Sequence, residues 1–422
     1  GRRLPREIIR ALALIKKAAA MANETVGELV PEKARLIVTA AEEVADGRWD
    51  EHFIVDPLQG GAGTAANMNA NEVIANRANE LLGNPPGSYN PVHPLEHVNL
   101  GQSTNDVFPT AVKLAAIWDL RDLVAEVAHL QEVMQKKEAE FAAVVKIGRT
   151  QLQDAVPITL GAEFSAYAEA LSRDRWRLYR LEERLRVVNL GGTAVGTGIN
   201  AGRTFQFELL KTLRDLSGVG LARADNLVEA TQNADVFCET SGLLKPLAVT
   251  LSKIASDLRL MASGPHSAIG EILLPAVQEG SSIMPGKVNP VMCEMLNQIA
   301  FKVYGNDLVI THAAEMGQLE LNAFVPVIMD SLLDSFMLLR RGIRLFADRC
   351  ATGIQANVER CRENLKGSLG ILTVLEKKLG HQMTSDIYRR HLETGQPIVQ
   401  LLIESGLVTP ADIDAAIDAY HL

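Results

Sequence analysis

The chain has 422 residues and a formal charge of −9, with 47% hydrophobic and 22% charged residues. This composition is ordinary for a globular protein, and the length allows two or three domains. The acidic charge and the low aromatic content (5%) argue against a nucleic-acid partner, and no apolar run is long enough to predict a membrane span. The four cysteines form no CxxC pair, which favours reduced thiols in a cytoplasmic protein over a disulfide framework or zinc site.

The first hundred residues are predicted to form helices separated by loops. Leu12 and Ile15 lie on the apolar face of a first helix, and a second helix follows Pro31. The glycine-rich segment 59–64 precedes another helix, but it lacks the GK[ST] ending and the preceding strand of a phosphate-binding loop. Residues 83–101, rich in proline, glycine, asparagine and histidine, are predicted to form a connection and a domain boundary.

Long helices are predicted from residue 109 onward, where apolar residues recur at three- and four-residue spacing. They comprise one of about 30 residues after Pro109, one that begins within 148–157 and ends near Val188, and three at about 230–262, 291–314 and 321–348. No strand-like alternation of any length is recognised between residues 100 and 350. Five long helices with short polar links indicate an elongated all-α bundle, and the shorter, charged helices after residue 351 indicate a small C-terminal domain.

Some of these helices lack a polar face. Residues 246–251 carry no charge, and Arg259 is the only polar side chain in 258–262. A helix that is apolar around its whole circumference is normally buried in a large core. One five-helix bundle cannot bury such helices completely, so we expect several copies of the chain to associate.

The segment at 279–290 reads Glu-Gly-Ser-Ser-Ile-Met-Pro-Gly-Lys-Val-Asn-Pro. Its glycines and prolines predict a loop, which could be an ordinary surface turn or a mobile loop that closes over a ligand. Lys287 can bind a carboxylate, and Asn289 can donate a hydrogen bond beside it. The hydroxyl groups of Ser281 and Ser282 are suited to proton transfer or anion binding.

This segment resembles the GSSxMPxKxNP signature of the aspartase/fumarase superfamily at every fixed position. The resemblance covers nearly all of residues 5–415 and implies a mainly α, three-domain fold with a central bundle of five long helices. The boundaries expected from it are 1–100, 101–352 and 353–422. The family also implies a homotetramer with a twenty-helix core, in which three subunits build each active site. Because family members carry a further segment before the first helix, we expect the sequence given to be truncated there.

The resemblance implies specific roles for residues in four motifs. Ser281 corresponds to the catalytic base. The residues that correspond to substrate-binding positions are Thr64, Ser103, Thr104, Asn105, Thr150, Gln151, Ser282, Lys287 and Asn289. These side chains are mainly cationic or neutral hydrogen-bond donors, which suit a small dicarboxylate such as L-aspartate or fumarate. No metal-ligand spacing is present, so neither a metal nor another cofactor is expected.

The implied reaction is an anti-elimination through an enolate-like intermediate stabilised by hydrogen-bond donors. Residues 59–64, 148–154 and 314–322 resemble the ammonia-lyase versions of their motifs more than the fumarase versions. Fumarases carry a histidine at the position of Gln151, paired with a glutamate at the position of Glu294. An amide cannot take a proton from water near neutral pH, so Gln151 favours release of ammonia over hydration.

Two alternatives remain open. The chain could be a fumarate hydratase, or a catalytically silent member of the superfamily. Retention of Ser281, Lys287 and Asn289 argues against the silent alternative. The stretch from His93 to His97 lacks the aspartate of a second anion site found in fumarases, so these histidines are expected to be ordinary surface residues of a loop.

Overall fold

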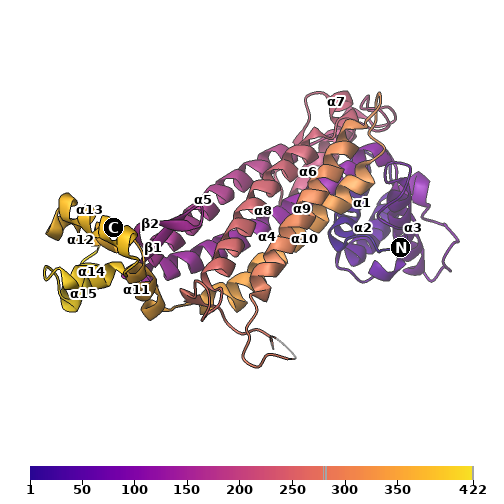
Figure 1. Ribbon diagram of the computed structural model, residues 1–422. Coiled ribbons are helices and arrows are strands. Elements are labelled where there is room, and N and C mark those ends of the chain that lie inside the picture. The colour runs from indigo at the N-terminus through magenta and orange to yellow at the C-terminus, as the bar shows by residue number, and fades with distance from the viewer. Residues whose placement is uncertain (279, 281–282, 421–422) are drawn as a thin grey trace. The chain divides into compact units, whose positions relative to one another are not determined.

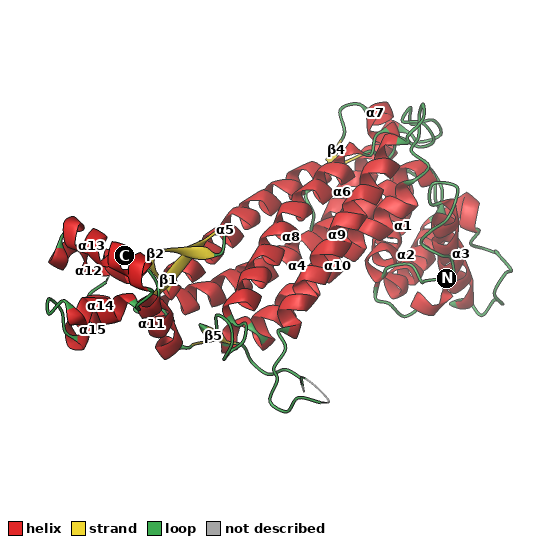
Figure 2. Ribbon diagram, in the orientation of Figure 1, coloured by secondary structure: helices red, strands yellow, loops and turns green. Residues whose placement is uncertain are grey.

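The computed structural model describes residues 1–278, 280 and 283–420. Helices dominate these residues, and their few strands form two-stranded sheets (Figures 1 and 2). The chain divides into two compact units by its internal contacts. The first unit comprises Gly1–Val124, Trp176–Ala248 and Phe301–Arg340, and the second comprises Ala125–Arg175, Val249–Ala300 and Arg341–Leu422.

Five long helices in the described part of the chain contribute residues to both units. They are α4 (Thr104–Glu140), α5 (Leu160–Leu185), α8 (Asp235–Met261), α9 (Val291–Glu315) and α10 (Val325–Arg349). The predictions of a mainly α fold and of five long central helices are confirmed. The three predicted domain boundaries remain a prediction.

Besides its segments of the five long helices, the first unit contains shorter helices. Its further elements are α1 (Arg6–Thr25), α2 (Pro31–Ala45), α3 (Thr64–Glu80), α6 (Arg203–Ser217), α7 (Leu227–Gln232), the helical turns η1 (Asp50–His52) and η2 (Pro94–Val98), and the parallel pair β3 (Val187–Val188) and β4 (Ala222–Arg223). Helix α1 packs against α2 and α6, because its apolar face, including Leu12 and Ile15, is fully buried. Arg121 of α4 pairs with Glu182 of α5 at 2.8 Å.

The second unit contains a β-hairpin and the C-terminal helices. Its further elements are β1 (Val145–Thr150), β2 (Gln153–Thr159), β5 (Ile272–Leu273), the turn η3 (Ala351–Gly353), β6 (Gln355–Ala356), α11 (Val358–Gly367), α12 (Gly370–Leu379), α13 (His381–Thr394), α14 (Ile398–Glu404) and α15 (Pro410–Asp418). Val145 and Ile147 of the hairpin share one hydrophobic core with the C-terminal helices, whose fully buried members include Leu365, Leu375 and Leu401. The hairpin is therefore anchored to the C-terminal helices by apolar packing.

The expectation that residues 100–350 contain no strand of any length is wrong. Strands β1 and β2 pair antiparallel, with a register shift between Ile147 and Arg149. Gly148 lies at this irregularity, where a Cβ atom would be 2.7 Å from the carbonyl oxygen of Val156. The register shift interrupts the alternation of side chains that would have indicated a strand.

Several helix ends also differ from the predictions. Helix α4 has 37 residues, more than expected. The helix predicted from residue 230 begins at Asp235, because Asn233 adopts an extended conformation after α7. Helix α10 begins at Val325 rather than near residue 321, and α6 was not predicted. No helix in the described ranges combines the length and apolar character needed to cross a membrane.

Two neighbouring glycines allow a matched test of the loop before α3. Gly63 has a φ of +93°, and a Cβ there would lie 2.5 Å from the ring of Phe108, whereas a Cβ at Gly60 would meet no atom within 4 Å. We expect Gly63→Ala to lower the free energy of unfolding by roughly 1–3 kcal/mol, the usual cost of overpacking. Gly60→Ala should change it by less than about 0.5 kcal/mol. Urea unfolding of both variants measures the difference, and equal stabilities would contradict the close packing at Gly63.

Candidate active site

Ser103 and Thr104 lie at the start of α4 and line a cleft of about 360 Å³ in the first unit. Asn67 of α3 and Thr193 line the same cleft, and the Asn67 Nδ2 group donates to Thr104 Oγ1 at 3.0 Å. The start of a helix presents backbone N–H groups and a positive dipole end, which together favour an anion. The cleft is therefore suited to a small ligand that carries carboxylates.

The start of α4 is held by the side chain of Asp106. The carbonyl group of Ser103 accepts the first helical hydrogen bond, from the N–H of Val107, and Asp106 Oδ1 accepts from the N–H of Ser103 at 3.0 Å. The other carboxylate oxygen of Asp106 accepts from the N–H groups of Gly191 (2.9 Å) and Thr193 (3.1 Å). Asp106 thus joins the helix start to a loop 85 residues further along the chain.

Asp106 was not among the predicted site residues, although a signal for it exists. Its side chain is fully buried. Burial raises the pKa of Asp106 to about 6, against the opposing effect of its backbone N–H donors. The spacing Ser-x-x-Asp at 103–106 is a capping-box pattern, so the sequence could have assigned Asp106 to the helix start. No sequence signal connects it to residues 191–193.

A buried lysine, also missed by the sequence analysis, supports the cleft from α1. Lys16 is fully buried, and its Nζ donates to Asn99 Oδ1 at 2.9 Å and to Gln102 Oε1 at 3.0 Å. Asn99 and Gln102 are lining residues of the cleft. Burial lowers the pKa of Lys16 to about 7, against the attraction of Asp106, so the amine is largely neutral in mildly alkaline solution.

The remaining predicted residues of the first unit have partners within the chain. Asn105 Nδ2 donates to the carbonyl oxygen of Ala194 at 2.7 Å. Thr64 is exposed at the start of α3, and its Oγ1 donates to the carbonyl oxygen of Gly61 at 2.7 Å. The structure therefore brings Ser103 and Thr104 together at the cleft, whereas the side chains of Thr64 and Asn105 hydrogen-bond to backbone carbonyls.

In the second unit, Thr150 and Gln151 lie at the exposed tip of the β1–β2 hairpin. Thr150 pairs with Gln153 across a two-residue turn formed by Gln151 and Leu152. Both turn residues have left-handed φ values, +54° and +61°. Such turns normally contain glycine or asparagine. Two strained residues at a predicted site agree with the tendency of backbone strain to gather at functional positions.

The signature segment is described only in part. Ser281 and Ser282, the predicted base and its neighbour, lie outside the described residues. Asn289 Nδ2 donates to the carbonyl oxygen of Gly280 at 2.8 Å, so this predicted donor is bonded within its own segment. Lys287 is exposed. In the described part of the chain, no three His, Cys, Asp or Glu side chains are placed to share a metal ion.

The histidines at 93 and 97 are not fully exposed, contrary to the expectation. Both are half-buried in or next to the π-helical turn η2. His93 Nδ1 accepts from the N–H groups of Leu95 and Glu96, and His97 Nε2 contacts Lys33 Nζ at 2.7 Å. Burial and the charge of Lys33 lower the pKa of His97. These contacts explain why both imidazole rings are held in place at the turn.

Comparison with known proteins identifies full-length relatives. A protein family described as lyase matches residues 2–305. The chain is 48% identical to an aspartate ammonia-lyase of Bacillus subtilis over 422 residues, which cover all of this chain and 89% of that protein. It is 45% identical to an aspartate ammonia-lyase of Helicobacter pylori, with 96% of this chain and 87% of that protein covered.

Solved structures show the same fold. A crystal structure of fumarate lyase:delta crystallin from Brucella melitensis bound to cobalt matches with a TM-score of 0.92 and 49% identity, and the match covers 98% of this chain and 90% of that one. A class II fumarase from Schistosoma mansoni matches with a TM-score of 0.89 and 35% identity over the same shares of the two chains.

The lowered pKa of Lys16 predicts how the free energy of unfolding depends on pH, and replacing Lys16 tests this prediction. Between the folded pKa of about 7 and the ordinary value of 10.5, the unfolded chain holds a proton on Lys16 that the folded chain lacks. The native lysine therefore makes the free energy of unfolding rise with pH across this window, by up to about 1.4 kcal/mol per pH unit. Lys16→Met removes this contribution, so the variant should lose stability relative to the parent as the pH rises from 7 to 9. Urea unfolding at matched protein concentration measures the difference, and a constant difference would refute it.

Proposed function

Because the chain belongs to the aspartase/fumarase superfamily of lyases, we propose that it catalyses the reversible elimination of ammonia from L-aspartate to give fumarate. The observation that carries this proposal is the match, over nearly the whole chain, to curated aspartate ammonia-lyases. The lower identity to the class II fumarase agrees with it. The amide at position 151, in place of a group that could deprotonate water, supports the same choice.

In the proposed mechanism, Ser281 removes a proton from the carbon next to the β-carboxylate of L-aspartate. The electron pair moves into that carboxylate and gives a doubly charged, enolate-like intermediate. The pair then forms the carbon–carbon double bond of fumarate as the bond to nitrogen breaks and ammonia leaves. Because the intermediate carries more negative charge than the substrate, donors fixed around the carboxylate lower the barrier.

Substrate binding is assigned to the residues identified by resemblance. Lys287 and Asn289 would bind one carboxylate, and Ser282 lies beside the base. Thr64, Ser103, Thr104 and Asn105 would supply neutral donors around the start of α4 and α3, and Thr150 and Gln151 would act from the hairpin tip. The cleft at Ser103 and Thr104 and the strained turn at Gln151 support this assignment. Ser281 also needs neighbouring positive charge or N–H groups to lower its pKa.

We further propose a homotetramer in which subunits share active sites. Large apolar side chains of the long helices are exposed in the single chain, as this assembly requires. Phe301 and Leu308 of α9 are 62% and 60% exposed, and Val249 of α8 is 52% exposed. Burial of such side chains between copies would supply a large part of the association energy. The four cysteines are free thiols, which supports the proposed cytoplasmic location.

The choice of substrate is tested by parallel assays with L-aspartate and L-malate. We expect L-aspartate to be deaminated and L-malate to be dehydrated at least about a hundredfold more slowly by kcat/KM, which corresponds to about 2.7 kcal/mol in barrier. The physical reason is that hydration chemistry needs a base for water, which Gln151 cannot provide. Fumarate absorbance gives both rates. Comparable rates would remove the aspartate assignment and leave the superfamily membership intact.

Shared active sites are tested by complementation. Ser281→Ala alone should lower turnover by roughly two orders of magnitude, the usual effect of losing a positioned base. Thr150→Ala should also be impaired. When the two variants are unfolded and refolded together, sites that combine intact segments from different chains should regain part of the activity. Each variant refolded alone is the control. A folded, active monomer in sedimentation, or no recovery in mixed tetramers, would refute the sharing of sites.

A further inference from the structure

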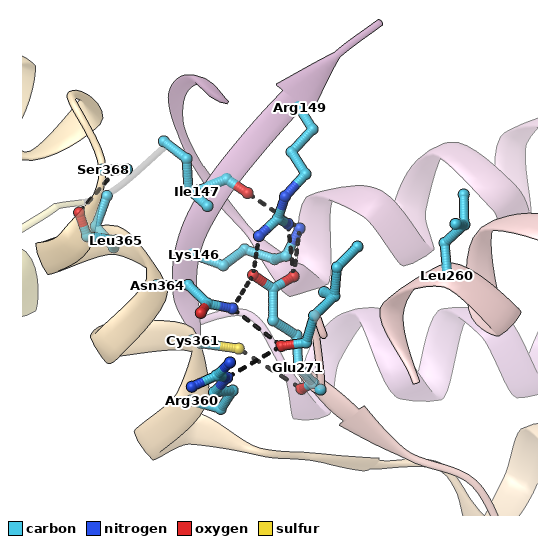
Figure 3. Close-up of polar contacts among 12 residues, drawn as sticks. Lys146, Ile147, Arg149, Leu260, Glu271, Arg360, Cys361, Asn364, Leu365 and Ser368 are labelled. Carbon is cyan, nitrogen blue, oxygen red and sulfur yellow. Dashed lines mark hydrogen bonds and ion pairs between the residues drawn. The ribbon is translucent and has the colours of Figure 1, made fainter. Parts of the chain in front are cut away.

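A buried carboxylate, Glu271, lies at the centre of a polar cluster in the second unit (Figure 3). Its side chain is 0% exposed. Arg149 binds it through two parallel hydrogen bonds, from Nη1 to Oε2 at 3.0 Å and from Nη2 to Oε1 at 2.9 Å. Lys146 Nζ lies 3.1 Å from Oε2, and Asn364 Nδ2 donates to Oε1 at 3.0 Å.

The charges in this cluster are balanced. Lys146, only 2% exposed, also binds Glu163 at 2.8 Å, so two cations face two carboxylates. Burial alone would raise the pKa of Glu271, but its bonds to Arg149, Lys146 and Asn364 outweigh burial and lower the pKa. Glu271 is thus held as a carboxylate and is not suited to donate a proton. Its hydrogen bonds indicate that it orients the side chains that bind it, Arg149 above all.

The cluster connects two segments that carry proposed site residues. Arg149 directly precedes Thr150 and Gln151 at the hairpin tip. Glu271 directly precedes β5, from which the chain continues into the signature segment. The backbone of Glu271 is itself fixed, because its N–H donates to the carbonyl oxygen of Met261 (2.8 Å) and its carbonyl oxygen accepts from the N–H of Asn357 (2.9 Å). Glu271 is therefore a fixed point against which Arg149 is oriented.

The hairpin turn needs such support from outside. Gln151 and Leu152 both hold left-handed φ values without being glycine. This conformation persists only where the surrounding structure enforces it. The side chain of Leu152 is 66% exposed and cannot anchor the turn by burial. The two-point bond of Arg149 fixes both the position and the orientation of the strand at the residue before Thr150.

We propose that Glu271 is a positioning residue, which acts through Arg149 to hold Thr150 and Gln151 in the conformation that meets the substrate. This inference rests on the proposed function for the roles of Thr150 and Gln151. A purely structural role would affect the stability of the fold and leave the kinetics of the folded enzyme unchanged. A positioning role changes the kinetics of enzyme that is still folded.

The first test is Arg149→Lys, which keeps the charge in the cluster but replaces the planar fork with a single ammonium group. The matched control is Arg344→Lys. Arg344 also makes a two-point bond to a carboxylate, through Nε and Nη2 to Glu126 at 2.8 and 2.9 Å, and this pair joins α10 to α4 within the second unit. No hydrogen bond or ion pair of the described structure joins Arg344 to the hairpin tip. Both variants are assayed well below their melting temperatures.

We expect Arg149→Lys to lower kcat/KM for L-aspartate about thirty- to a hundredfold, with KM raised and kcat lowered, because misplacement by about 1 Å can have an effect of this size. Arg344→Lys should stay within twofold of the parent. Folded Arg149→Lys with kcat and KM within twofold of the parent would overturn the proposal.

Glu271→Gln tests whether the carboxylate acts through Arg149. It keeps the shape of the side chain and removes its charge. If Glu271 acts through Arg149, adding Glu271→Gln to Arg149→Lys should lower kcat/KM by less than threefold, although Glu271→Gln alone lowers it more than tenfold. Multiplicative effects of the two changes would overturn the proposal. If Glu271→Gln does not fold, because Lys146 then keeps Glu163 as its one carboxylate partner while Arg149 loses its own, the Arg149→Lys comparison still decides.

Hydrogen exchange separates this inference from the proposed function. If the parent does not deaminate L-aspartate, the proposed function fails, but the ordering of the hairpin tip can still be measured. Peptides that contain Thr150 and Gln151 should exchange at least about tenfold faster in Arg149→Lys than in the parent, since the turn opens locally when its support is weakened. Arg344→Lys should leave them unchanged. Equal exchange in the parent and Arg149→Lys would overturn the inference whatever the substrate.

Discussion

Two buried carboxylates, one in each unit, order the segments that carry proposed site residues, and each depends on all of its hydrogen-bond donors. Asp106 in the first unit accepts three backbone N–H groups, and Glu271 in the second is bound by Arg149, Lys146 and Asn364. A carboxylate removed from water is costly unless its hydrogen bonds are made, so any movement of the donors is opposed by a large free energy. Each carboxylate therefore fixes the relative positions of segments that are distant in sequence.

Those segments carry the residues to which the resemblance gives a function. Asp106 fixes the start of α4, where Ser103 and Thr104 line the cleft, and Glu271 fixes the strand that ends at Thr150. At the start of α4 and at the hairpin tip, the proposed substrate-binding side chains are neutral and at least partly accessible to solvent. The carboxylates that hold them, Asp106 and Glu271, are fully buried. This separation lets a hydroxyl or amide meet a ligand without moving, because the energy that orders it is supplied by the buried neighbour.

The sequence predicted the parts of this structure that depend on local periodicity. The long helices follow from apolar residues at helical spacing, and their number was correct. The β1–β2 hairpin was missed for two physical reasons: the irregular register at Gly148 breaks the alternation, and the turn at Gln151 and Leu152 lacks the residues that usually mark one. The motifs pointed to Ser103 and Thr104, which line a cleft, and their role in a site remains a prediction. The bonds of Asp106 and Glu271 join residues 85 and 122 positions apart. Such long-range partners cannot be inferred from local pattern.

The charge of the cleft bears on how a dicarboxylate would bind. Among the described residues that line the cleft, none carries a charge. Lys16, whose amine contacts the lining residues Asn99 and Gln102, has its pKa lowered to about 7 and already donates to both. A substrate with two negative charges, and an intermediate with more, therefore require a cation from outside the lining. Lys287 is exposed in its own segment and is the cation assigned to a substrate carboxylate by resemblance. In the proposed tetramer, the neutral cleft of one subunit would receive the cation that a dicarboxylate needs from the signature segment of another subunit.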